Sequence, residues 1–184
     1  MRMLSLLGSG IALAALPILA VAQIPPDFVP KAQMGAPASI SANATIAHID
    51  AAGKAVHIIR QGTNGFTCSL IPDESAAPFC ADAQGWQFLA DAFTGKPKPT
   101  STAPGIGYMA AGGVHYETPN GEIVMAPGTN TKMVQEPPHW MLLWPIDPAT
   151  SGLPTKATGA TYIMFAGTPY AHLMIYQDPK TLKL

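Results

Sequence analysis

Charged side chains are scarce in this sequence. Asp, Glu, Lys and Arg make up 11% of its 184 residues, whereas an ordinary soluble domain carries about 25%. This scarcity excludes a coiled coil, and a formal net charge of −1 offers no basic surface to nucleic acid. Hydrophobic residues make up 48% of the chain, which excludes a disordered protein. We therefore expect a folded domain that binds no nucleic acid.

Familiar catalytic signatures are also missing. The chain contains no G-x-S-x-G nucleophile elbow, no H-E-x-x-H and no C-x-x-C. The Gly105-Ile106-Gly107 segment lacks the third glycine, three residues on, that a dinucleotide-binding turn requires. No motif declares a reaction, and the sequence favours a non-catalytic domain over an enzyme.

The one long apolar run stands at the start of the chain. Residues 1–22 combine a positive charge at Arg2, an uncharged stretch over 4–19, and the small-x-small triplet Ala20-Val21-Ala22. That order is typical of a secretory signal peptide cleaved after Ala22. A membrane anchor is the weaker alternative, because two glycines and a proline interrupt the run. We expect an exported protein, periplasmic or secreted, with no stable membrane span after cleavage.

Cysteine is nearly absent, with two residues in the whole chain. Cys68 and Cys80 are twelve positions apart, and an exported chain enters an oxidising environment, so the pair is expected to form a disulfide. Closing a loop of this size stabilises a fold by about 3 kcal/mol on the chain-entropy model. A reactive thiol is the alternative, and it would need a nearby base and a reducing compartment.

Proline and glycine are plentiful, with 19 and 17 residues, and they mark the organisation of the chain. Residues 23–37 contain four prolines, each of which disfavours helix at the preceding residue, so an extended leader is expected there. Residues 38–184 are expected to form a single globular domain, since a chain of this length can bury one core. Residues 100–138 are expected to be rich in loops.

Strand-like runs dominate this domain. Residues 44–49, 55–60 and 66–70 are separated by turn residues and predict an antiparallel meander. Residues 82–94 predict one main helix, because apolar side chains recur there at i, i+3, i+4 and i+7 and Asp82 stands at its start. Three more apolar runs close the chain, at 139–144, 161–166 and 170–176. The expected fold is α+β, an antiparallel β-sheet-rich single domain with one main helix.

One pattern occurs twice in the closing runs. His139 and Met141 are two positions apart, and so are His172 and Met174. In a strand, residues i and i+2 point to the same face, so each pair presents an imidazole and a thioether together. If the two strands are neighbours, the four side chains converge into a ligand set that suits copper, especially Cu(I). The plainer alternative is a core or pocket-lining role, because Met fills gaps in cores and His often donates to a carbonyl.

Acid–base candidates are few because charges are few. His115 and Glu117 are two positions apart, and His139 follows Glu136 by three. Either pair can serve as a base with its orienting carboxylate in a hydrolase or lyase, given suitable geometry. Both pairs are expected in loops, where a solvated polar pair is ordinary.

Four segments together carry a family resemblance: residues 60–68 (RQGTNGFTC), 78–82 (PFCAD), 138–141 (PHWM) and 167–174 (GTPYAHLM). In combination they resemble a group of exported bacterial proteins without an assigned activity. The resemblance extends over about residues 38–176. It implies a single bacterial domain that is periplasmic or secreted, and it brings no catalytic residues with it.

Three functional hypotheses follow from the sequence. The first is an exported, non-catalytic domain that binds a small ligand, a metal such as copper, or a protein partner near His139, Met141, His172 and Met174. The second is a hydrolase or lyase that uses one of the His/Glu pairs. The third is a purely structural envelope protein without a pocket.

Overall fold

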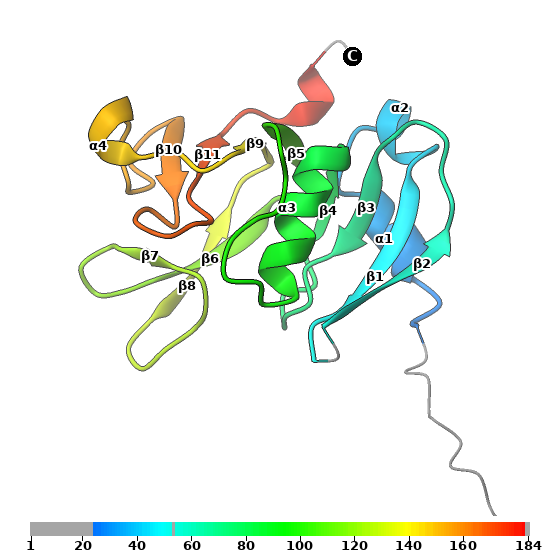
Figure 1. Cartoon of the computed structure of the whole chain (residues 1–184), viewed down its shortest axis with the longest axis horizontal. Helices are drawn as coiled ribbons and strands as arrows, with labels where there is room; N and C mark the ends of the chain where they lie inside the picture. The colour runs from blue at the N-terminus through cyan, green and yellow to red at the C-terminus, as the bar shows by residue number, and fades with distance from the viewer. Residues whose placement is uncertain (1–23, 53, 183–184) are drawn as a thin grey trace, which may run out of the picture.

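The computed structural model describes residues 24–52 and 54–182 (Figure 1). Its main element is a mixed eight-stranded sheet in the order β10-β11-β9-β5-β4-β3-β1-β2, and a second sheet has the order β7-β6-β8. Helix α3 (Ala83–Phe93) crosses the front of the large sheet in Figure 1, and α1 (Phe28–Gln33) lies behind it. This architecture confirms the predicted β-rich α+β fold with one main helix. The predicted signal peptide, residues 1–22, lies outside the described residues.

The strands are short. The large sheet contains β1 (Thr45–Asp50), β2 (Ala55–Arg60), β3 (Thr67–Leu70), β4 (Pro78–Ala81), β5 (Gly105–Met109), β9 (His139–Leu143), β10 (Thr161–Met164) and β11 (His172–Ile175). The small sheet contains β6 (Gly113–Glu117), β7 (Ile123–Val124) and β8 (Lys132–Glu136). The shorter helical segments are α2 (Ala38–Ser41), α4 (Pro148–Ser151) and a 3₁₀ turn (Pro179–Thr181).

Residues 100–138 contain many loop residues, as expected, but four strands, β5, β6, β7 and β8, also lie there. Glycine is a loop signal in a sequence, but here it stands inside strands where neighbours approach closely. A Cβ at Gly105 would lie 2.0 Å from the backbone nitrogen of Gly85 in α3. Close backbone approach is one of the uses of glycine within a strand.

The first three strands do not form a meander. β1 pairs with β2 in antiparallel fashion, as expected, but β3 pairs with β1 in parallel, with Thr45 opposite Thr67. After β2 the chain passes the start of β1 and joins its other edge. Gly62 allows this crossing, since a Cβ there would lie 2.2 Å from the backbone nitrogen of Thr45.

The extended leader predicted for residues 23–37 is wrong in its central part, where α1 forms. Pro30 is the third residue of this helix, and proline is tolerated in a first turn because the N–H that it lacks would have no intrahelical acceptor. Phe28 and Ala32 are buried against the large sheet. The proline-rich segment therefore contributes side chains to the core rather than forming an extended leader outside it.

Helix α3 matches its predicted position within one residue at each end. The side chain of Asp82 accepts a hydrogen bond from the backbone nitrogen of Gly85 at 2.8 Å, which caps the helix. Phe88 and Leu89 are buried on the face that contacts the sheet. None of the described helices is long and apolar enough to cross a membrane.

Each face of the large sheet has its own hydrophobic core. Phe79 packs with α3 on one face, whereas its neighbour Cys80 packs with α1 on the other, as alternation along a strand requires. Cys68 and Cys80 are directly opposite each other on β3 and β4 and form the predicted disulfide. Both cysteines are fully buried, so the bridge lies inside the α1-side core.

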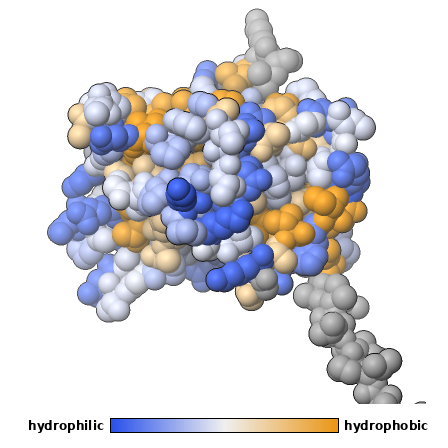
Figure 2. Space-filling model, in the orientation of Figure 1, coloured by the Kyte–Doolittle hydropathy of each residue, from blue (hydrophilic) through white to orange (hydrophobic). Residues whose placement is uncertain are grey.

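The β2 end of the large sheet exposes apolar side chains. The edge strand β2 carries two of the exposed large hydrophobic residues, Val56 and Ile58, and apolar surface is visible on that side of the molecule in Figure 2. The imidazole rings of the half-buried His48 and the exposed His57 lie across β1 and β2 with centroids 6.3 Å apart. The two His-x-Met motifs lie toward the other end, on β9 and β11.

Candidate functional site

The two His-x-Met motifs lie on adjacent strands. β9 and β11 are antiparallel neighbours, and their register places Met141 directly opposite Met174. His139, Met141, His172 and Met174 are all buried, and all four line one cavity of about 100 Å³. The strands that carry the predicted ligands are therefore neighbours, and the side chains meet at a common cavity.

The two imidazoles, however, lie at opposite ends of the methionine pair. Because the strands run in opposite directions, the residue two positions before Met141 and the residue two positions before Met174 extend away from each other. On the outer strands, Met109 of β5 is opposite His139, and Met164 of β10 is opposite His172. We call these six cavity-lining side chains the Met–His band: Met109, His139, Met141, Met174, His172 and Met164.

A glycine makes room for the middle of the band. Gly107 is opposite Met141 on the neighbouring strand β5, and a Cβ at this position would lie 2.9 Å from the methyl carbon of Met141. Any larger residue would displace the thioether. The sequence of β5 thus leaves space for a long, flexible side chain from β9.

Both histidines of the band are held in the same tautomer. Nδ1 of His139 donates to the carbonyl oxygen of Pro137 at 2.7 Å, and Nδ1 of His172 donates to that of Tyr170 at 2.8 Å. A carbonyl oxygen only accepts, so each neutral ring carries its lone pair on Nε2. Burial lowers the pKa of His172 to about 4 and also lowers the pKa of His139. Both rings are therefore neutral at neutral pH, which is the form that binds metals.

The cavity has an acidic group beside His139. Glu136 is buried, and its Oε1 accepts hydrogen bonds from Nδ1 of His115 at 2.6 Å, from the hydroxyl of Tyr176 at 3.2 Å and from the hydroxyl of Tyr162. Burial raises the pKa of Glu136, but the hydrogen bonds from His115 and Tyr162 and the charge of His115 lower it by more. The carboxylate is therefore ionised at neutral pH.

The second oxygen of this carboxylate faces His139. Oε2 of Glu136 lies 3.6 Å from Nε2 of His139, beyond hydrogen-bond distance. Nε2 of His139 is buried and has no hydrogen-bond partner among the described residues. Two acceptor atoms thus face each other with no donor from the described part of the chain between them.

His115 connects the buried carboxylate to the surface. Its Nδ1 contacts Glu136, its Nε2 lies 3.0 Å from Oε1 of Glu117, and Oε2 of Glu117 lies 2.9 Å from Nζ of the exposed Lys132. Burial lowers the pKa of His115, but hydrogen bonds with the two glutamates raise it by more. Since both ring nitrogens face carboxylate oxygens, the ring is doubly protonated in this arrangement.

The sequence paired His115 with Glu117 and His139 with Glu136, and placed both pairs in loops. The structure places all four residues in the strands β6, β8 and β9, so the loop expectation is wrong. These positions belong to the small sheet and to the strand that follows it. The structure also brings His115 and Glu136 together, a contact that joins the two expected pairs into one cluster.

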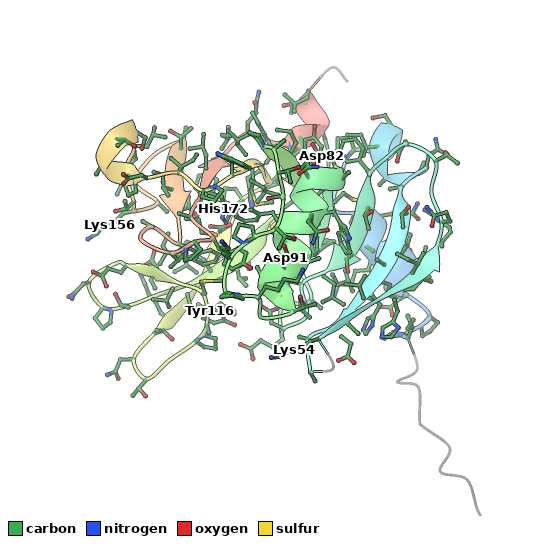
Figure 3. All side chains as sticks on the ribbon, viewed as in Figure 1. Lys54, Asp82, Asp91, Tyr116, Lys156 and His172 are labelled. Atoms are coloured by element: carbon green, nitrogen blue, oxygen red, sulfur yellow. A yellow bond between two sulfur atoms is a disulfide. The ribbon has the colours of Figure 1, made fainter. Side chains whose placement is uncertain are left out.

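The His172 end of the band is aromatic instead. The ring of His172 lies edge-on to Phe88 of α3, at 5.9 Å between centroids, and to Phe165, at 5.6 Å. Figure 3 shows His172 between α3 and the strands at the β10 end of the sheet, and Tyr116 on the side of the small sheet. No hydrogen bond or ion pair joins His172 to a carboxylate among the described residues.

Metal sites built from harder ligands are not found in this part of the molecule. Within residues 24–52 and 54–182, no group of three or more His, Cys, Asp or Glu side chains is arranged to hold a metal ion. Neither cysteine is free, because both form the disulfide. Any metal site at this cavity therefore depends on the thioethers of the Met–His band.

Four residues of the site were missed by sequence reasoning. Met109 and Met164 each stand at the last position of a strand, and Tyr162 and Tyr176 lie two positions from Met164 and Met174. Period-two spacing places the two tyrosines on the same face as the band, and that signal was present in the sequence. The sequence contains no signal for the pairing of β5 and β10 with the two strands that carry the His-x-Met motifs.

Fold and site together define an α+β domain with a cavity whose lining includes buried methionine and histidine side chains. Comparisons with protein-family models, with curated proteins and with solved structures give no match. The resemblance to exported bacterial proteins therefore stays a prediction.

Proposed function

We propose that this protein is an exported, non-catalytic domain that binds Cu(I) in the cavity lined by the Met–His band. The four thioethers and two neutral imidazoles of the band are among the side chains that line this cavity. Thioether and imidazole form a soft ligand set, and soft ligands favour Cu(I) over the harder ions of calcium and magnesium. With both cysteines in the disulfide, methionine supplies the sulfur ligands.

The observation that carries this proposal is the unpartnered Nε2 of His139. Leaving a buried polar atom without a hydrogen bond costs about 1–3 kcal/mol, and such atoms often mark the place of a ligand or an ion. The carbonyl of Pro137 holds the ring so that this nitrogen offers a lone pair rather than a proton. A metal ion is the kind of ligand that such a nitrogen accepts.

Export is part of the proposal and has its own support. The signal-like residues 1–22 and the resemblance to exported bacterial proteins both indicate a periplasmic or secreted protein. A buried disulfide is compatible with an oxidising compartment.

The test is a Cu(I) titration of the protein under anaerobic conditions, in competition with a Cu(I)-specific chelating dye. We expect a His139→Ala/His172→Ala double variant to bind Cu(I) at least 10-fold more weakly than the unaltered protein. The matched control is a His48→Ala/His57→Ala double variant, which removes one imidazole from β1 and one from β2, away from the cavity, and should retain the affinity. Equal affinities of the cavity variant and the unaltered protein would rule out the proposed function.

A second candidate function is acid–base catalysis by a hydrolase or lyase. It is favoured by one observation: His115 lies within hydrogen-bond distance of both Glu136 and Glu117, and Glu136 lines the cavity. Hydrolysis of activated esters such as p-nitrophenyl acetate would test the hydrolase form. A rate that stays at background, and is the same for Glu136→Gln, would count against it.

The third hypothesis, a purely structural envelope protein, predicts no ligand at all. In the structure the four side chains of the motifs are buried together around a cavity rather than apart. A protein that neither binds Cu(I) nor hydrolyses esters would favour this hypothesis.

A further inference from the structure

The two ends of the Met–His band differ in one respect that matters for a cation. The His139 end has a buried carboxylate 3.6 Å from the imidazole nitrogen, whereas the His172 end is enclosed by Phe88 and Phe165. A cation that leaves water for a buried cavity is stabilised by a nearby negative charge and destabilised where none is present. A bound cation should therefore prefer the His139 end of the band.

The geometry at the His139 end suits a shared ion. Oε1 of Glu136 accepts from three donors, His115, Tyr162 and Tyr176, while Oε2 accepts from no donor within residues 24–52 and 54–182. Two ligand atoms that are each about 2.1 Å from a metal ion at a tetrahedral angle lie about 3.4 Å apart. The observed separation of Oε2 and Nε2 of His139, 3.6 Å, is close to this value.

The positive charge of His115 does not cancel the carboxylate. The ring of His115 is shared between Glu136 and Glu117, so its charge is divided between two carboxylates. Lys132, the other cation of the cluster, contacts Glu117 and is 70% exposed. Two carboxylates line the cavity, and Glu136 is the buried one, since Asp73 is exposed.

We infer that the cation lies between Nε2 of His139 and Oε2 of Glu136, with thioethers from the neighbouring Met109 and Met141, and that Glu136 is its buried counter-charge. This inference rests on the proposed function. It adds a carboxylate to the ligand set of His139, Met141, His172 and Met174, and it makes the two His-x-Met motifs unequal. His172 and Met164 then form the far wall of the cavity.

The first test compares Cu(I) affinities measured by competition with the chelating dye. Glu136→Gln keeps the shape of the side chain and removes its charge, and we expect it to weaken Cu(I) binding at least 10-fold. Glu117→Gln removes the other carboxylate that contacts His115, and we expect less than a 3-fold change. A Glu136→Gln protein that binds as tightly as the unaltered one, while His139→Ala/His172→Ala does not, would overturn this inference and leave the proposed function intact.

The second test uses the unaltered protein, so it does not depend on whether a variant folds. Ag(I) is a closed-shell ion of the same charge and softness, and long-range ¹H–¹⁵N correlation spectra report the state of each imidazole nitrogen. We expect Ag(I) to shift Nε2 of His139 by far more than Nε2 of His172. A larger shift at His172, or equal shifts at the two rings, would overturn the inference. If neither ring responds, the proposed function fails as well.

Discussion

The two His-x-Met motifs share their local structure but not their surroundings. In each, the histidine is buried, and its Nδ1 donates to the carbonyl oxygen two residues earlier. Around His139 there are a carboxylate and the hydroxyl-bearing ring of Tyr176. Around His172 there are the rings of Phe88 and Phe165. The local sequence thus sets the tautomer, and the neighbouring strands and helix set the electrostatic environment.

The same difference divides the cavity into a polar end and an apolar end. The polar end continues through His115 and Glu117 to Lys132 at the surface, and its charges alternate in sign. The apolar end packs on α3 and is part of the hydrophobic core. We therefore expect substitutions at the polar end to act through charge and those at the apolar end to act through packing.

The largest expected effect comes from removing the partner of the buried carboxylate. His115→Leu leaves Glu136 without its cationic partner, and breaking a buried ion pair from one side costs about 3–5 kcal/mol. At the apolar end, His172→Leu leaves only the carbonyl of Tyr170 without a donor, which costs about 1–3 kcal/mol. Denaturant unfolding measures both.

The double variant His115→Leu/Glu136→Gln provides the control for this comparison. It carries no unpaired buried charge, so we expect it to be more stable than His115→Leu alone. If the double variant were less stable than the single one, the charge argument for the polar end would be wrong.

The next effect is on Cu(I) affinity, from a matched pair of substitutions. Met109→Leu and Met164→Leu each remove one thioether of the band while conserving volume, so each should cost less than about 1.5 kcal/mol in stability. We expect Met109→Leu to weaken Cu(I) binding about 10-fold, because Met109 is opposite His139, and Met164→Leu to weaken it less than 3-fold. The reverse order would place the ion at the apolar end.

Two buried histidines, His172 and His115, should contribute to the pH dependence of stability with opposite signs. Burial lowers the pKa of His172 to about 4, below the value of about 6.5 in the unfolded chain, so its contribution is lost as the pH falls from about 6.5 toward 4. For His115, the two glutamates outweigh burial and raise the pKa, so its contribution is full below about 6.5 and is lost as the pH rises through the raised value. An NMR titration of the imidazole protons checks both directions.

A variant separates the His172 contribution from those of the carboxylates, which also titrate in acid. The free energy of unfolding of His172→Gln should fall less steeply between pH 6.5 and 4 than that of the unaltered protein. Parallel pH profiles would show that folding does not lower the pKa of His172.

Local patterns in the sequence predicted those features that depend on neighbouring residues. Helix α3 follows from the cap at Asp82 and from helical spacing, and the disulfide follows from having two cysteines in a chain that the sequence predicts to be exported. Period-two alternation also placed each histidine on the same face as its methionine. All of these depend on contacts within about a dozen residues.

The rest depends on pairing between distant segments. Met141 and Met174 are 33 residues apart, and nothing in either run specifies that they are opposite each other rather than one position out of register. The parallel pairing of β3 with β1 likewise depends on a crossing at Gly62. The clustering of Glu136 with His115 and Tyr162 needs the small sheet and the large sheet to meet, which no local pattern reports.

The smallest expected effect is that of substituting Lys132, the residue at the surface of the polar end. Lys132 contacts Glu117 at 2.9 Å but is 70% exposed, and exposed ion pairs contribute about 0–1 kcal/mol because water screens them. Lys132→Ala should therefore change the free energy of unfolding by less than about 1 kcal/mol and leave the Cu(I) affinity within 2-fold. High salt should weaken this contact in the unaltered protein without weakening the buried contact of His115 with Glu136. A larger loss of Cu(I) affinity in Lys132→Ala would mean that the surface lysine, through Glu117 and His115, controls the charge that the cavity presents to the ion.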